Sequence, residues 1–168
     1  RVPMESIGTF YAALEKTRRG GELGMRTQAT AAVVLMLTGL RKADVVNRRW
    51  EEVDLEAGTL YVPDTKHRQP RTFPLARQAR NAIQDLAPLT GGGEFVFAKV
   101  KGSGPMEDIR EGMGPAKKAI DHHVAPHDLR RTFDDLFDHL GVDPIVGELL
   151  TNRTPQGVRF KHYAQTSD

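Results

Sequence analysis

Four groups of residues along the chain could carry out chemistry on an anion. The first is "PHDLRRTF", where a helix start is followed closely by Arg130 and Arg131. The helix dipole disfavours positive charge at an N-terminus, whereas His127 and Arg130, three residues apart, can share one side of the helix. This spacing indicates an anion held between the two side chains. A solvated basic face is the alternative interpretation.

The other three groups are weaker when each is taken alone. In "LTGLRKADV", Asp44 could pair with Arg41, although an ion pair at the surface contributes little. In "GVRFKHYAQ", Tyr163 could act as a nucleophile if neighbouring cations lower the cost of ionising a phenol whose ordinary pKa is about 10. In "PDTKHRQPRTF", a hairpin tip carries cations that could contact nucleic-acid phosphates or could simply be solvated: Lys66, His67, Arg68 and Arg71.

The bulk composition excludes several classes of protein. The 168 residues are 39% hydrophobic and 27% charged, with a formal net charge of +2, which is typical of one globular domain. No run of about 18 apolar residues predicts a membrane-spanning helix, and the first residues do not resemble a signal peptide. The absence of cysteine excludes disulfides, thiol catalysis and cysteine zinc sites. We therefore expect a cytoplasmic protein without membrane association, and the start at Arg1 suggests a fragment of a longer chain.

Hydrophobic periodicity predicts the elements that must position the four groups. The fold class that these elements predict is mixed α+β and mostly helical. Alternation between residues 53 and 75 predicts a small three-stranded antiparallel meander with turns at "EAG" and "KHRQP", and "FVFA" predicts a short strand or extended piece. Gly39 is expected to end the second helix, and "RRGGELG" is expected to be a loop. Helices are predicted over 5–17, 26–38, 41–48, 76–88, 106–122, 127–140, 143–151 and 154–164.

Taken together and in this order, "TGLRKADVVNRRW", the lysine hairpin, "HDLRRTF" and the terminal "HYAQ" resemble the tyrosine recombinase family, the phage integrases. The resemblance covers the whole chain. It implies that residues 1–168 form the integrase catalytic domain, without the separate N-terminal DNA-clamping domain of the family. It also implies a site-specific DNA recombinase that cleaves and rejoins strands through a 3′-phosphotyrosyl intermediate, with no metal or other cofactor.

The resemblance implies a role for each candidate. Arg41 and Arg130 clamp the scissile phosphate, because a guanidinium forks onto two oxygens and stays charged. His127 hydrogen-bonds the same phosphate and helps to manage the proton of the tyrosine. Lys66 protonates the departing 5′-oxygen, and Tyr163 is the nucleophile.

Two further positions carry expectations from the family pattern. Asp44 stands at an acidic position, usually glutamate, that orients the site. Asn152 stands where most members have histidine and some have tryptophan. It can donate a hydrogen bond but cannot titrate, and the loss of a well-placed donor can cost about 2.7–4 kcal/mol of barrier. We expect reduced or normal activity. Arg131 has no role in the pattern and is interpreted as a surface or phosphate contact, and the last DNA-contact candidate is Arg159.

Two other functions remain open: a catalytically impaired, recombinase-like DNA-binding module, indicated by Asn152 and the modest net charge, and a type IB topoisomerase-like enzyme. A metal site at His122, His123 and His127 is disfavoured because adjacent histidines on a helix point apart. The implied partners are double-stranded DNA attachment sites and, in the full-length protein, three further copies in a tetramer on DNA. A bacterial or phage origin and a nucleoid-associated cytoplasmic location are also implied. We expect the 168 residues alone to be largely monomeric and to bind DNA weakly.

Overall fold

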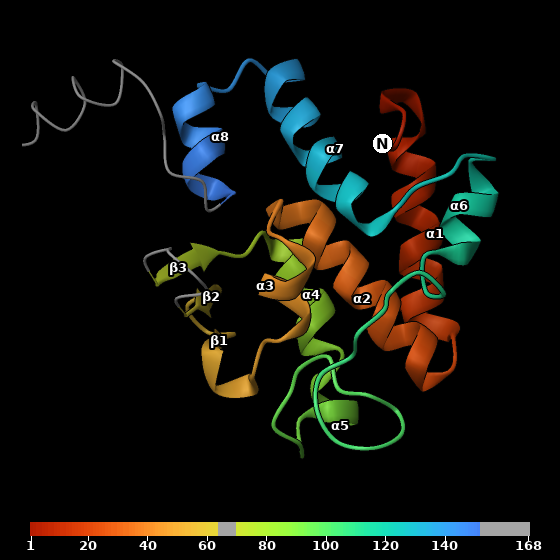
Figure 1. Cartoon of the computed structure of the whole chain (residues 1–168), viewed down its shortest axis with the longest axis vertical. Helices are drawn as coiled ribbons and strands as arrows, with labels where there is room; N and C mark the ends of the chain where they lie inside the picture. The colour runs from red at the N-terminus through yellow and green to blue at the C-terminus, as the bar shows by residue number, and fades with distance from the viewer. Residues whose placement is uncertain (64–69, 152–168) are drawn as a thin grey trace, which may run out of the picture.

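The fold is organised around one buried helix. The computed structural model describes residues 1–63 and 70–151, and its central element is α2 (Leu23–Thr38), which crosses the middle of the domain (Figure 1). Residues 29–36 of α2 are all buried, which is the pattern of a helix that is apolar all round. It packs against α1 (Ile7–Gly20), α3 (Lys42–Val46), α4 (Arg77–Gln84) and α7 (Pro126–His139). The helices adjacent to α2 in sequence, α1 and α3, and the distant helices α4 and α7 are thereby held on one core.

The sheet has three antiparallel strands in the order β1 (Val53–Asp54), β2 (Thr59–Val62) and β3 (Arg71–Pro74). Leu60 pairs with Phe73 across β2 and β3, and both side chains are buried. The side chain of Tyr61, between Leu60 and Val62, is exposed. This alternation is that of a sheet with one face on the core and one toward solvent. The prediction of a three-stranded antiparallel meander is confirmed.

Short helices complete the domain. The turn η1 (Met4–Ser6) precedes α1, η2 (Trp50–Glu52) leads into β1, and α5 (Ala87–Thr90) follows α4. α6 (Gly114–Ala119) packs on α1, and α8 (Pro144–Leu150) packs on α7. The fold is thus mostly helical with one small sheet, as predicted. Within the described residues, no helix combines the length and the apolar character needed to cross a membrane.

The expected loop at "RRGGELG" is wrong over most of its length. α1 continues through Gly20 and α2 begins at Leu23, so only Gly21 and Glu22 connect them. The reason is Arg18, which is only 5% exposed. Its guanidinium donates to both carboxylate oxygens of Glu15 at 2.6 and 2.7 Å and to Asp85 at 2.6 Å. A charge that looked like part of a solvated loop instead ties α1 to the end of α4.

The helix predicted over 106–122 is also wrong in its first half, since only Gly114–Ala119 is helical. Met106 instead donates its N–H to the carbonyl of Phe97 at 2.7 Å, next to an isolated bridge between Ala98 and Pro105. The prediction of a short strand or extended piece at "FVFA" is wrong, because Val96 and Phe97 form a turn between the isolated bridges of Phe95 with Arg49 and of Ala98 with Pro105. The predicted helix over 154–164 and most of the predicted turn at "KHRQP" lie outside the described residues.

Candidate active site

The site is built where α2 ends and α3 begins. Gly39 ends α2 in the left-handed conformation at φ +60°, and the chain changes direction after it. Leu40 is fully buried, and Arg41 is the exposed N-cap residue of α3. A β-carbon on Gly39 would lie 2.3 Å from Phe133 of α7. The chain therefore turns in close contact with α7, and a glycine is required there for both conformation and space.

The N-terminus of α7 is capped by its own sequence. Pro126 occupies the first turn, where its missing N–H has no cost. Asp128 accepts the N–H of Ala125 at 2.9 Å and an Nη1–H of Arg131 at 3.2 Å. Burial raises the pKa of Asp128, but these hydrogen bonds and the positive charges of the N-terminal amino group and of Arg131 outweigh it and hold the pKa below its ordinary value. The carboxylate offsets the positive charge at this helix start, and Arg131 itself is exposed and paired with Asp128.

Arg130 occupies a different environment from Arg131. It is 4% exposed, and its Nη1 donates to the carbonyl of Gly39 and to the carbonyl of Thr151, each at 2.8 Å. The first bond joins α7 to the end of α2, and the second joins it to the end of α8. Because a guanidinium is planar, two bonds to one nitrogen fix the plane of the whole group. The arginine is therefore oriented before any ligand binds.

Asp44 brings the two arginine segments together. It is 3% exposed, so the interpretation of a surface ion pair is wrong. Burial raises its pKa above the ordinary value, although the positive charges of Arg41, Arg48 and Arg130, together with a hydrogen bond from the backbone of Arg41, act in the opposite direction. The carboxylate thus lies among three guanidinium groups. The charges of Arg41 and Arg130 therefore both act on this one buried carboxylate, and the orienting role expected for Asp44 stays a prediction.

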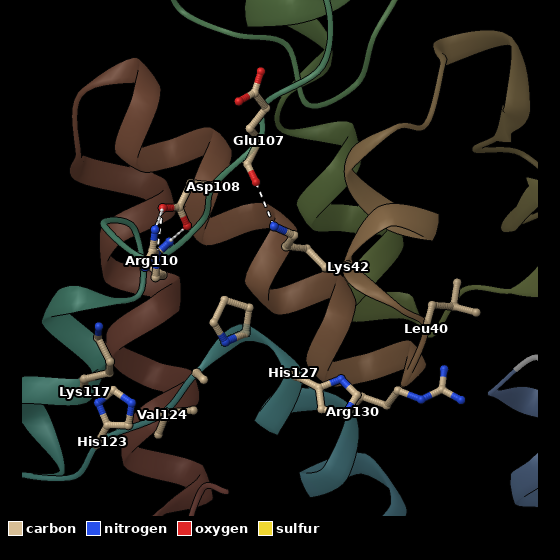
Figure 2. Close-up of a pocket in the computed structure, with 12 residues that line it drawn as sticks. Leu40, Lys42, Glu107, Asp108, Arg110, Lys117, His123, Val124, His127 and Arg130 are labelled. Atoms are coloured by element: carbon tan, nitrogen blue, oxygen red, sulfur yellow. Dashed lines mark hydrogen bonds and ion pairs between the residues drawn. The ribbon is translucent and has the colours of Figure 1, made fainter.

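His127 and Arg130 line one pocket of about 690 Å³ at the start of α7. Figure 2 shows both side chains on the same side of the helix, with Lys42 of α3 opposite them. The prediction that the two residues share one face is confirmed. The pocket reaches from Leu40 to the loop at 107–110 and to α6. Its polar lining consists of Lys42, Glu107, Asp108, Arg110, Lys117, His123, His127 and Arg130.

Several predicted residues cannot be placed in this pocket. Arg71 is the half-buried first residue of β3. Lys66, His67, Arg68, Asn152, Arg159 and Tyr163 lie outside the described residues. Among the residues that are described, no three His, Asp or Glu side chains come together as a metal would require.

Sequence reasoning missed Arg48, which is 3% exposed. Its Nη1 donates to the carbonyl of Tyr61 at 3.2 Å and lies 3.3 Å from a carboxylate oxygen of Glu52. Burial lowers its pKa, and the charges of Glu52 and Asp44 partly restore it. The i, i+4 spacing between Asp44 and Arg48 was a usable signal, whereas nothing local marked Arg48 as buried.

Comparison with known proteins identifies the class of fold and site. The sequence model of the Phage integrase family matches residues 2–144. The chain is 39% identical over 98 residues to Prophage integrase IntZ of Escherichia coli (strain K12), a match that covers 57% of this chain and 23% of IntZ. It is 26% identical over 165 residues to Prophage integrase IntA of the same strain, covering 88% and 40% of the two chains. It is 27% identical over 159 residues to Tyrosine recombinase XerC of Xylella fastidiosa (strain M23), covering 87% and 53%.

Solved structures show the same fold. XerA recombinase superposes with a TM-score of 0.73 at 18% identity, covering 99% of this chain and 63% of that one. XerH recombinase, bound to its difH substrate, superposes with a TM-score of 0.74 at 14% identity, covering 100% and 53%. Because the family model matches residues 2–144, most of the chain, the chain belongs to the phage integrase family. It spans about half or less of the length of the curated relatives named above.

Proposed function

We propose that residues 1–168 form the catalytic domain of a site-specific DNA recombinase that cleaves and rejoins strands through a tyrosine. The observation that carries this proposal is the fixed guanidinium of Arg130, which lines a pocket with His127 and shares the buried Asp44 with Arg41. Such a set of pre-oriented donors stabilises the negative charge that develops on a phosphodiester under attack. The named relatives, which are integrases and tyrosine recombinases, support the same function.

In this proposal Arg41 and Arg130 bind the non-bridging oxygens of the scissile phosphate. The planar guanidinium suits a tetrahedral phosphate because it can donate two parallel hydrogen bonds and cannot lose its charge. The bonds of Arg130 to Gly39 and Thr151 avoid the entropic cost of orienting a long side chain when DNA arrives. His127 donates a further hydrogen bond from the same face of the pocket.

The covalent step exchanges one phosphate ester for another. The phenolic oxygen of Tyr163 forms a bond to phosphorus as its proton passes to His127, the bond from phosphorus to the 5′-oxygen breaks, and Lys66 gives that oxygen a proton. The product is a 3′-phosphotyrosyl link and a free 5′-hydroxyl. A 5′-hydroxyl of the partner strand reverses the step, so the bond energy is retained and no nucleotide cofactor is consumed. The roles of Lys66 and Tyr163 rest on the family pattern.

Asn152 is proposed as a neutral hydrogen-bond donor to the phosphate. Its role, like those of Lys66 and Tyr163, rests on the family pattern. A carboxamide can donate but cannot exchange protons at neutral pH. We therefore expect Asn152→His to raise the cleavage rate moderately. A very large gain would favour the alternative of a catalytically impaired DNA-binding module.

The wider setting is proposed on the same grounds. The relatives are longer than the matched region, which supports a longer protein in which residues 1–168 are the catalytic domain. We propose double-stranded attachment sites as the substrate, a homo-tetramer on two duplexes as the working assembly, and the cytoplasm with its nucleoid as the location. Relaxation of a supercoiled plasmid without strand exchange would instead favour a type IB topoisomerase-like activity.

The proposal is tested by trapping the covalent intermediate. The purified chain is incubated with a library of nicked duplexes whose central positions are randomised, so that the short strand released by cleavage diffuses away and the ester accumulates. Denaturing gels should show a protein–DNA band for the wild type and none for Tyr163→Phe. Absence of the band from folded wild-type protein across the whole library would contradict the proposed function.

A further inference from the structure

The pocket at the start of α7 is larger than one phosphate requires. Its volume is about 690 Å³, whereas one water molecule occupies about 30 Å³ in the liquid. A phosphate held by His127 and Arg130 would fill only one end. The pocket continues past Pro126 to Lys117 of α6 and His123 of the following loop. Figure 2 shows Lys117 and His123 beside each other, at the far side of the site from Arg130.

The charges at this far side do not cancel. Arg110 is paired with Asp108, whose carboxylate accepts from Arg110 Nε at 2.7 Å and whose pKa is lowered to about 2, chiefly by that side-chain hydrogen bond. The Glu107 carboxylate is paired with Lys99 at 2.6 Å. Both pocket acids therefore already have partners.

Two lysines that line the pocket form no ion pair with any other described residue. Lys42 Nζ donates to the neutral backbone carbonyl of Glu107 at 2.8 Å, which orients the ammonium without neutralising it. Lys117 is half-buried and, over residues 1–63 and 70–151, forms no ion pair. A half-buried ammonium in a concave site attracts an anion more strongly than a fully solvated one does.

We propose that Lys117 and His123 form a second phosphate subsite, with Lys42 on the rim between it and Arg130. This inference rests on the proposed function, and its ligand is the phosphate next to the scissile one on the same DNA strand. The two subsites open into one continuous pocket, as two successive phosphates of one strand require. The second subsite would set the register of the strand, so that one particular phosphate lies at Arg130.

The first test compares Lys117→Gln with Lys118→Gln. Lys118 is the next residue of α6, is exposed and does not line the pocket, so both variants lose the same charge from the same helix. Binding of a 20-base-pair duplex of arbitrary sequence is measured against KCl concentration by fluorescence anisotropy. Loss of one phosphate contact should reduce the slope of log K against log salt by about 0.9. We expect that reduction for Lys117→Gln and a much smaller one for Lys118→Gln.

The second test follows the imidazole NMR signals of His123 and His127. Inorganic phosphate is compared with 5′-phosphorylated dithymidine, which carries two successive phosphates. The dinucleotide should shift both signals in the wild type, and Lys117→Gln should keep the shift of His127 while losing that of His123.

The outcomes separate the two proposals. The second subsite would be overturned if Lys117→Gln and Lys118→Gln gave equal slopes of log K against log salt. It would also be overturned if the dinucleotide shifted the His123 signal of Lys117→Gln as much as that of the wild type. If the wild-type adduct still forms at the same time, the recombinase function stands without it. A wild-type chain that binds no duplex at low salt and forms no adduct would overturn both.

Discussion

Replacing Gly39 with alanine should both destabilise the domain and displace Arg130. A residue with a β-carbon in the left-handed region costs about 1–2 kcal/mol. The added carbon would also lie 2.3 Å from Cδ1 and 2.8 Å from Cγ of Phe133, so the ring or α7 must move. Overpacking of this kind costs about 1–3 kcal/mol. The expected loss in free energy of unfolding is therefore about 2–5 kcal/mol, measured by urea denaturation followed by circular dichroism.

Two variants separate these contributions. Gly141 has a similar φ of +66° with no heavy atom within 4 Å of an added β-carbon, so Gly141→Ala should cost only the conformational part, about 1–2 kcal/mol. Phe133→Ala removes the ring, and the double variant Gly39→Ala/Phe133→Ala should be more stable than the sum of the single losses predicts, by about 1–3 kcal/mol. Strict additivity, or equal losses at Gly39 and Gly141, would refute the close contact between this turn and α7.

Two further predictions concern the charged groups of the site. Arg130→Lys should slow single-turnover cleavage of a nicked duplex at least tenfold, which corresponds to an increase of about 1.4 kcal/mol in the activation free energy. The reason is that one ammonium group cannot reproduce the hydrogen bonds of the fixed, planar guanidinium. Arg131→Lys, which alters only the surface pair with Asp128, should stay close to the wild-type rate, and equal effects would contradict the assignment. The folded-state pKa of Asp44 is raised, so the wild type should lose stability as pH rises from the unfolded value of about 3.9 through the folded value. Asp44→Asn has no carboxyl group at this position and so lacks this loss. The difference in free energy of unfolding, variant minus wild type, should therefore increase from pH 4 to pH 7, and a decrease would contradict a raised pKa for Asp44.

The parts of this domain that the sequence predicts well are those with local causes. The apolar run of α2, the glycine that ends it and the three-residue spacing of His127 and Arg130 all depend on neighbours along the chain, and the structure confirms each. The alternation of buried and exposed residues in the sheet is likewise local. Such features need no knowledge of what packs against them.

The features that could not be predicted depend on distant partners. Arg18 extends α1 because Asp85, far along the chain, accepts from it. Asp44 is buried because α3 packs against α2. No local sequence pattern predicts this packing. The basic side of the pocket forms only in the tertiary structure, where Lys117 of α6 lines the same pocket as His127 and Arg130 of α7. The chemistry-bearing residues were therefore identifiable one by one, while their burial and pairing required the tertiary structure.

The central claim is that this chain forms a covalent bond to DNA through Tyr163. The most direct measurement is mass spectrometry of the trapped adduct after digestion with protease and nuclease. We predict one modified peptide, in which Tyr163 carries a nucleotide through its 3′-phosphate. Attachment at another residue, or through a 5′-phosphate, would contradict the account.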